Sequence, residues 1–211
     1  GAVVLPAAGG GVDGGDQGSF ETDLVLWATG RNPNTKGLGL EAAGVTLDKA
    51  GAVVVDEFNQ SSVTSIYAVG DVTNRVQLTP VAIREGHAFA DTVFGGHKRT
   101  VDYRAIPTAV FSSPPISGVG LTEVQARAEF GDAVKVYRSD FRPMKNVVSG
   151  RQERGLYKMI TAGPEEKVVG LHLIGPDSSE ILQAAAIAVK AGLGKAAFDD
   201  TVALHPSMAE E

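Results

Sequence analysis

The chain has 211 residues, a net charge of −6 and no cysteine. Without cysteine it can form no disulfide, thiolate zinc site, cysteine-ligated iron–sulfur cluster or cysteine nucleophile. The acidic balance argues against nucleic acid as a partner, because nucleic-acid-binding proteins normally carry a basic patch. No apolar run approaches the roughly 18 residues of a membrane span. At 43% hydrophobic and 21% charged residues, the composition is that of a globular protein.

The first third of the chain predicts short strands separated by glycine-rich turns. The apolar run at residues 24–28 is typical of a strand buried on both faces. We expect the first two strands to form a hairpin. The predicted segments are a strand at 3–5, a loop at 9–18, a strand at 20–29, a helix at 38–43, and strands at 52–56 and 65–69.

A helix and then a boundary follow. Thr79 and Pro80 predict a helix start, with Thr as the N-cap and Pro at the first helical position. The helix is expected to run to about residue 94, where two glycines end it. The polar and basic stretch at 97–104 is expected to separate two bodies.

Beyond this boundary the pattern alternates strands with capped helices. The last two predicted strands flank a Gly-Pro turn and should form a hairpin. The predicted strands lie at 108–111, 134–137, 156–161 and 168–174, and the helices at 123–130 and 178–191. Capping boxes are expected at 122–125, 177–180 and 207–210. Because the sequence stops within the helix that the third box predicts, we expect the chain to be part of a longer protein.

Two segments could bind a cofactor. Gly30 and Arg31 follow an apolar strand, where a backbone can approach a ligand and a guanidinium can bind phosphate or carboxylate. The alternative is a strand exit with a solvated arginine. Asp71 also ends a predicted strand, and the helix beginning near Thr79 directs N–H groups and a positive dipole end outward. That pair suits a polyol and a group that becomes negative; the alternative is an Asx turn and an ordinary helix cap.

The third segment could carry acid–base chemistry. His205 precedes the predicted 207–210 box, and Glu210 lies in its first turn. A His–carboxylate pair orients the imidazole and raises its basicity, as a general acid–base requires. The alternative is a surface histidine before a capped helix, with Glu210 serving only the cap.

Taken together, the motifs resemble a known family. They are ATGRNPN (28–34), YAVGDV (67–72), LTPVA (78–82), FSSPPISGVGLTE (111–123), VVGLHLIG (168–175) and HPSMAEE (205–211). Six collinear segments resemble the carboxyl-terminal half of the flavin-dependent pyridine nucleotide–disulfide oxidoreductases. The resemblance implies an α/β and α+β fold. Residues 1–33 would end an NADPH-binding domain, and 34–103 would be a returning segment of a Rossmann-like FAD domain. Residues 104–211 would form an α+β interface domain, with an antiparallel sheet, that builds a homodimer.

The resemblance also implies roles for single residues. Asp71 would hold the ribityl chain of FAD, and Thr79 would bind the pyrimidine edge of the flavin. His205 would be the acid–base, oriented by Glu210 and reaching into the partner's site. The implied cofactor-binding residues are Gly30, Arg31, Gly70, Asp71, Gln77, Leu78, Thr79, Ala82, Ala109 and His205, with Gly30, Gln77 and Ala109 near NADPH. No metal site is implied.

Within the family, the members that reduce glutathione disulfide with NADPH fit best. Leu78-Thr79-Pro80 and Pro114-Pro115-Ile116 differ from the Leu-Ala-His and Pro-Glu-Val of members that act on dihydrolipoamide. His87 stands where some members carry an arginine that contacts glutathione. The redox cysteine pair would lie upstream, so this segment alone is expected to be inactive. The alternatives are a dihydrolipoamide dehydrogenase-like flavoenzyme and a non-catalytic dimerisation or cofactor-binding fragment. A cytoplasmic location is expected, with an organelle as the alternative.

Overall fold

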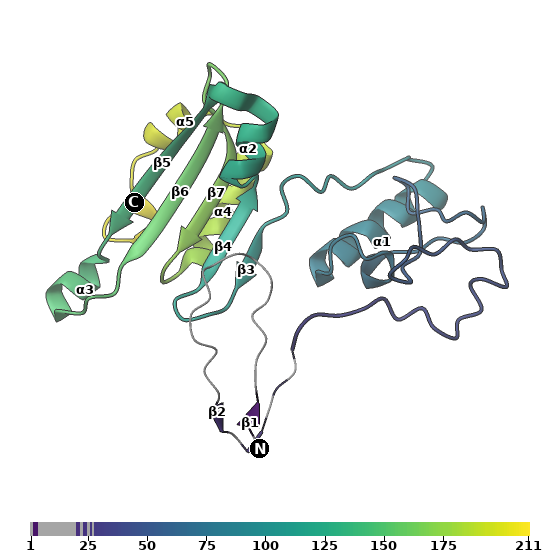
Figure 1. Ribbon diagram of the computed structural model, residues 1–211. Helices are drawn as coiled ribbons and strands as arrows, with labels where there is room; N and C mark the ends of the chain where they lie inside the picture. Colours follow the sequence, from purple (N-terminus) through teal and green to yellow (C-terminus); the bar gives the residue numbers. More distant parts are fainter. Residues whose placement is uncertain (1, 4–19, 22, 25, 27) are drawn as a thin grey trace. The chain divides into compact units, whose positions relative to one another are not determined.

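The computed structural model describes residues 2–3, 20–21, 23–24, 26 and 28–211, and Figure 1 shows its elements. The chain divides into two compact units. Unit 1 comprises residues 1–101 and unit 2 residues 102–211. The division falls within the predicted 97–104 boundary, whereas the further division at residues 33 and 34 stays a prediction.

In its described part, unit 1 contains little regular structure apart from one helix. Its elements are β1 (Ala2–Val3), which pairs antiparallel with β2 (Phe20–Glu21), η1 (Gly70–Thr73) and α1 (Thr79–Val93). The strands predicted at 52–56 and 65–69 are reduced to isolated bridges. These bridges join Leu47 to Val53, Val55 to Ser61 and Gln60 to Tyr67. Single bridges replace strands here because the chain turns back every few residues through hydrogen-bonded loops.

Two predictions in unit 1 are wrong. The 24–28 run is not a buried strand at its described positions, since Leu24 and Leu26 lie outside any strand and are 85% and 88% exposed. A strand buried on both faces needs neighbouring strands and cover on each side, and the described part of unit 1 supplies no such sheet. The 38–43 helix is instead a series of turns. Gly39 and Gly44 have positive φ and enclose too few residues to nucleate a helix. The predicted 9–18 loop lies outside the described residues.

Helix α1 is confirmed, but its cap is displaced by one residue. Leu78 is the N-cap, with an extended backbone, and Thr79 is already the first helical residue. No side chain caps this end of the helix. At the other end, Gly95 donates its N–H to the carbonyls of Ala90 and Asp91, as expected for a glycine that ends a helix.

Unit 2 is built on a five-stranded antiparallel sheet. Its strands are β3 (Thr108–Val110), β4 (Ile116–Gly120), β5 (Val134–Phe141), β6 (Gly155–Ala162) and β7 (Lys167–Ile174), in the order β3-β4-β7-β6-β5. The predicted β6–β7 hairpin is confirmed. Strand β5 is four residues longer than its prediction of 134–137, and β4 was not predicted.

Unit 2 also contains four α-helices and two 3-10 helices, of which α2 and α4 pack on the sheet. They are α2 (Glu123–Phe130), η2 (Gly131–Ala133), α3 (Met144–Ser149), α4 (Ser178–Lys190), α5 (Lys195–Asp199) and η3 (Met208–Glu210). The capping box at Thr122 and Gln125 is confirmed. The box predicted at Asp177 is wrong although its helix is right. Asp177 has φ +61 and its side chain makes no cap hydrogen bond, because a capping residue needs an extended backbone.

Two apolar cores lie on opposite faces of the sheet. Tyr157 and Ile160, three positions apart in β6, belong to different clusters, as alternation of side chains along a strand requires. Helix α4 contributes Leu182 to the larger cluster, and α2 contributes Ala126 to the smaller one. This packing fixes the frame from which the 205–211 segment extends. Across the described ranges, none of the helices is long and apolar enough to cross a bilayer.

Candidate functional site

The predicted His–carboxylate pair is present in unit 2. The Nδ1–H of His205 donates to Oε2 of Glu210 at 2.7 Å. His205 lies between α5 and η3, five residues before its partner. The pairing uses Nδ1, so Nε2 is the nitrogen left for proton exchange. The imidazole is 62% exposed, which leaves it accessible to a substrate.

Glu210 also caps the helical turn in which it lies. Its Oε1 accepts the backbone N–H of Ser207 at 3.3 Å, and Ser207 Oγ accepts the N–H of Ala209. The third predicted capping box is therefore confirmed. The hydrogen bond from His205, with that from Ser207, holds the pKa of the Glu210 carboxyl below its usual range. One carboxylate thus serves both the cap and the histidine, which the sequence analysis treated as alternatives.

A groove of about 570 Å³ lies beside this pair. Its walls are the end of β5, helix α3 and the 206–211 segment, with Pro206 and Glu210 among the lining residues. Met144, Val147 and Val148 of α3 are at least half exposed there. Helix α3 was not predicted, because it is only six residues long and has no side-chain cap. Two local signals were available: Pro143 at the N-cap position, and the i, i+3, i+4 spacing of Met144, Val147 and Val148.

Other titratable groups are less suited to proton transfer. Burial raises the pKa of Tyr157 to about 12, so its hydroxyl stays protonated near neutral pH. The ring of His172 interacts through Nε2 with the carbonyl of Leu121 at 2.9 Å, which is a structural contact. His87 lies exposed on α1. Among the residues that the structure describes, no group of three or more His, Cys, Asp or Glu could hold a metal ion.

Three of the predicted cofactor-binding residues meet in unit 1. Arg31 Nη1 lies 3.0 Å from Asp71 Oδ2. Arg31 Nη2 also donates to the carbonyl of Gln77 at 2.9 Å, and Gln77 Nε2 donates back to the carbonyl of Arg31 at 3.2 Å. The structure therefore brings the cation of Arg31 to a carboxylate and an amide that lie 40 and 46 residues further along the chain.

The start of α1 lies against the Gly70–Asp71 turn. Gly70 has φ +73, and a Cβ there would lie 3.0 Å from the Cβ of Ala82. Only a residue without a side chain allows this approach, so Gly70, Ala82 and the exposed Thr79 frame one end of the helix. Leu78 is the N-cap residue at the same end.

Two further residues, Gly30 and Ala109, are also predicted to bind a cofactor. Gly30 has φ +119 with open space around its α-carbon, so its conformation rather than a close contact favours glycine. Ala109 lies in β3 of unit 2, opposite Ser117. The two sites, one in each unit, are thus a carboxylate at a helix start and an exposed imidazole oriented by a carboxylate.

These features match one protein family. Residues 106–211 match the dimerisation domain of the pyridine nucleotide-disulphide oxidoreductases, and residues 6–86 match a second domain of pyridine nucleotide-disulphide oxidoreductases. The chain belongs to the pyridine nucleotide-disulphide oxidoreductase family, as its motifs predicted.

Two relatives with similar sequences are named glutathione reductase. The chain is 53% identical to a glutathione reductase of Burkholderia cepacia over 193 residues, covering 92% of this chain and 43% of the relative. It is 54% identical to the chloroplastic/mitochondrial glutathione reductase of Pisum sativum over 187 residues, covering 89% of this chain and 34% of the relative. The chain therefore spans less than half the length of these relatives.

A solved structure is also similar. The HOCl-induced flavoprotein disulfide reductase RclA from Escherichia coli matches with a TM-score of 0.81 and 33% identity. The match covers 92% of this chain and 44% of that one.

Proposed function

We propose that this chain is part of an FAD-dependent NADPH:glutathione-disulfide reductase. The observation that carries the proposal is the 2.7 Å pairing of His205 Nδ1 with Glu210, which orients an exposed imidazole. Two relatives that are more than 50% identical and named glutathione reductase support the choice of substrate.

His205 acts as the general acid in this proposal. When the disulfide of glutathione is cleaved, a thiol of the enzyme passes its proton to His205 Nε2, its sulfur bonds to one glutathione, and the other glutathione leaves as a thiolate. The thiolate takes a proton from His205 Nε2. Glu210, whose pKa is lowered and which is therefore ionised at neutral pH, stabilises the imidazolium before that transfer. The groove beside the pair contains Arg142 and Lys145, whose charges suit the carboxylates of glutathione.

The residues of unit 1 suit a flavin nucleotide. The half-exposed Asp71 carboxylate can accept hydrogen bonds from ribityl hydroxyls, and the turn at Gly70 lets a ligand approach the start of α1. These residues would hold FAD, which would supply a hydride acceptor for NADPH and a donor of two electrons to a disulfide of the enzyme. Because these 211 residues contain no cysteine, that disulfide belongs to another part of the enzyme. Thr79, Gln77 and Arg31 would contribute to the two cofactor sites.

The proposal includes a homodimer formed through residues 104–211. The match of residues 106–211 to a dimerisation domain supports it. In this arrangement His205 serves the active site of the partner subunit. A cytoplasmic location belongs to the proposal, and the name of the pea relative makes an organelle the alternative.

The test is His205→Gln in the full-length protein that contains this chain. We expect turnover of glutathione disulfide with NADPH to fall about 10²–10⁴-fold, because a general acid typically contributes that much. The flavin content should not change, since the proposal assigns flavin binding to Asp71 and Thr79, which this variant leaves intact. The control is His97→Gln, a second exposed histidine, which should leave turnover unchanged. Unchanged turnover in His205→Gln, or a native enzyme that reduces dihydrolipoamide-type disulfides but not glutathione disulfide, would contradict the proposal.

A further inference from the structure

Glu85 is a buried carboxylate on α1 that the proposed chemistry does not use. Its side chain is 1% exposed. Its Oε2 accepts the backbone N–H of Gly70 at 2.6 Å, and its Oε1 accepts from Arg75 Nη2 at 3.2 Å. A carboxylate is costly to bury without such partners, so its presence at this position calls for a reason.

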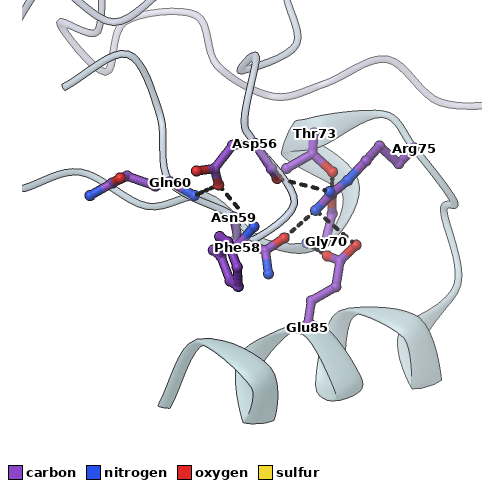
Figure 2. A network of polar contacts seen from close by, with 8 residues as sticks. All are labelled: Asp56, Phe58, Asn59, Gln60, Gly70, Thr73, Arg75 and Glu85. Atoms are coloured by element: carbon purple, nitrogen blue, oxygen red, sulfur yellow. Dashed lines mark hydrogen bonds and ion pairs between the residues drawn. The ribbon is translucent and has the colours of Figure 1, made fainter. Parts of the chain in front are cut away.

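The partners of Glu85 extend across unit 1 (Figure 2). Arg75 also donates to the side chain of Asn59 and to the carbonyl of Asp56. The Asp56 carboxylate accepts the backbone N–H groups of Phe58 and Gln60, each at 2.9 Å. The network therefore joins the 56–60 loop to η1 and α1.

Gly70 is the point at which this network meets the proposed flavin site. Its N–H is held by Glu85, and its carbonyl accepts from Thr73 Oγ1 at 2.8 Å. Both the N–H and the carbonyl of Gly70 are therefore hydrogen-bonded. On the side that faces α1, Ala82 leaves no room for a side chain on Gly70. The next residue is Asp71, so the orientation of its carboxylate depends on this turn.

We propose that Glu85 is a positioning residue for the flavin site. By accepting the Gly70 N–H, it sets the turn that presents the Asp71 carboxylate to the ribityl chain. This inference rests on the proposed function, because it takes Asp71 as the flavin ligand. A residue with a purely structural role would change the stability of unit 1 and leave the FAD affinity of the folded protein unaltered.

The first experiment isolates the single hydrogen bond. Removing one member of a buried ion pair would leave the other charge uncompensated, so Arg75→Met is present in both variants compared. R75M/E85Q keeps an amide oxygen that can accept the Gly70 N–H, whereas R75M/E85M replaces it with an apolar group of similar length. We expect FAD to bind full-length R75M/E85M at least about tenfold more weakly than R75M/E85Q, because that is the scale of a lost hydrogen bond to a buried N–H. Equal dissociation constants would overturn the proposal.

The second experiment tests whether the effect passes through Asp71. The same pair of variants is measured in an Asp71→Ala background. If Glu85 acts by orienting Asp71, the ratio of dissociation constants falls to near one, because the effects of coupled residues are not additive. If the ratio of FAD dissociation constants stays the same in the Asp71→Ala background, the proposal that Glu85 acts through Asp71 is overturned.

Two further variants keep the test sharp. If R75M/E85M does not fold, Glu85→Asp retains the charge for Arg75 but withdraws the carboxylate by one methylene, and it should weaken FAD binding in the same way. Asp91→Asn is the matched control, since Asp91 is also on α1 and paired with an arginine but is exposed. It should leave FAD affinity unchanged.

A full-length native protein without FAD would overturn the proposed function itself. Native FAD binding that Asp71→Ala weakens, with no effect of Glu85, would overturn this inference alone.

Discussion

The two units of this chain are stabilised by different kinds of interaction. In unit 2, both apolar clusters lie between a five-stranded sheet and the helices α2 and α4. In unit 1, the described interior contains few large apolar side chains, and Asn59, Thr73 and Glu85 are buried among hydrogen bonds instead. Unit 2 is therefore stabilised mainly by buried apolar surface, whereas unit 1 depends on specific hydrogen bonds between buried side chains and its loops.

This difference predicts how each unit responds to mutation. A core tolerates changes that keep volume and apolarity, and it fails when a cavity is opened. A polar network fails when one partner is removed, because the remaining group is left buried without a bond.

The largest effect on stability is expected from a cavity in unit 2. Leu182→Ala removes a side chain that is 1% exposed and lies in the larger cluster. We expect the free energy of unfolding to fall by about 2–5 kcal/mol, measured by urea denaturation. Val148→Ala, at an 87% exposed position of the same unit, should change it by less than about 0.5 kcal/mol. Similar losses in both variants would refute the contrast between core and surface.

An intermediate effect is expected from the network of unit 1. Asn59→Gly removes the amide oxygen that accepts from Arg75 while suiting the positive φ of this position. A loss of about 1–3 kcal/mol should follow, because the guanidinium loses a partly buried partner. Asn59→Ala should lose about 1 kcal/mol more through its backbone strain. Faster hydrogen exchange confined to the 56–60 and 70–73 amides would report the effect, and exposed Asn34→Ala is the control. No change in exchange would refute a network-based unit 1.

The smallest effect is expected at low pH on the surface of unit 2. Hydrogen bonds from Lys158 and Arg127 lower the pKa of Glu123 to about 2. A carboxyl whose folded pKa is lowered contributes stability above its unfolded pKa of about 4.5. That contribution is lost as the pH falls toward 2. Glu123→Gln should therefore reduce the change in the free energy of unfolding between about pH 4.5 and pH 2. Glu165→Gln, at an exposed position, is the control and should leave this change as it is. An unchanged acid slope in Glu123→Gln would contradict the assignment.

The sequence predicted unit 2 better than unit 1, for a physical reason. Strands β6 and β7 and the helices α2 and α4 carry their signals locally, in a turn, an apolar run or a capping residue. The bridges of unit 1 depend on contacts with distant loops, which no local pattern encodes. The 24–28 run failed for the same reason, since burial is a property of neighbours and not of the run itself.

The sequence motifs indicated the residues of the candidate sites, but they did not indicate the residues that position them. The motifs indicated His205, Glu210 and Asp71, and the structure pairs the first two directly and joins the third to Arg31. Glu85 escaped notice because a glutamate within an amphipathic helix normally faces water. Its burial follows from the approach of Gly70, which lies 15 residues away in the sequence.

The two oxygens of Glu210 have a consequence for the dynamics of the molecule. One oxygen accepts from the Ser207 amide and the other from the imidazole, so the same carboxylate holds η3 and the side chain of His205. In the proposed function, fraying of this turn would release the imidazole from its orientation and remove that molecule from the active population. The rate of the proposed proton transfer would thereby be coupled to the local unfolding equilibrium of a turn only three residues long.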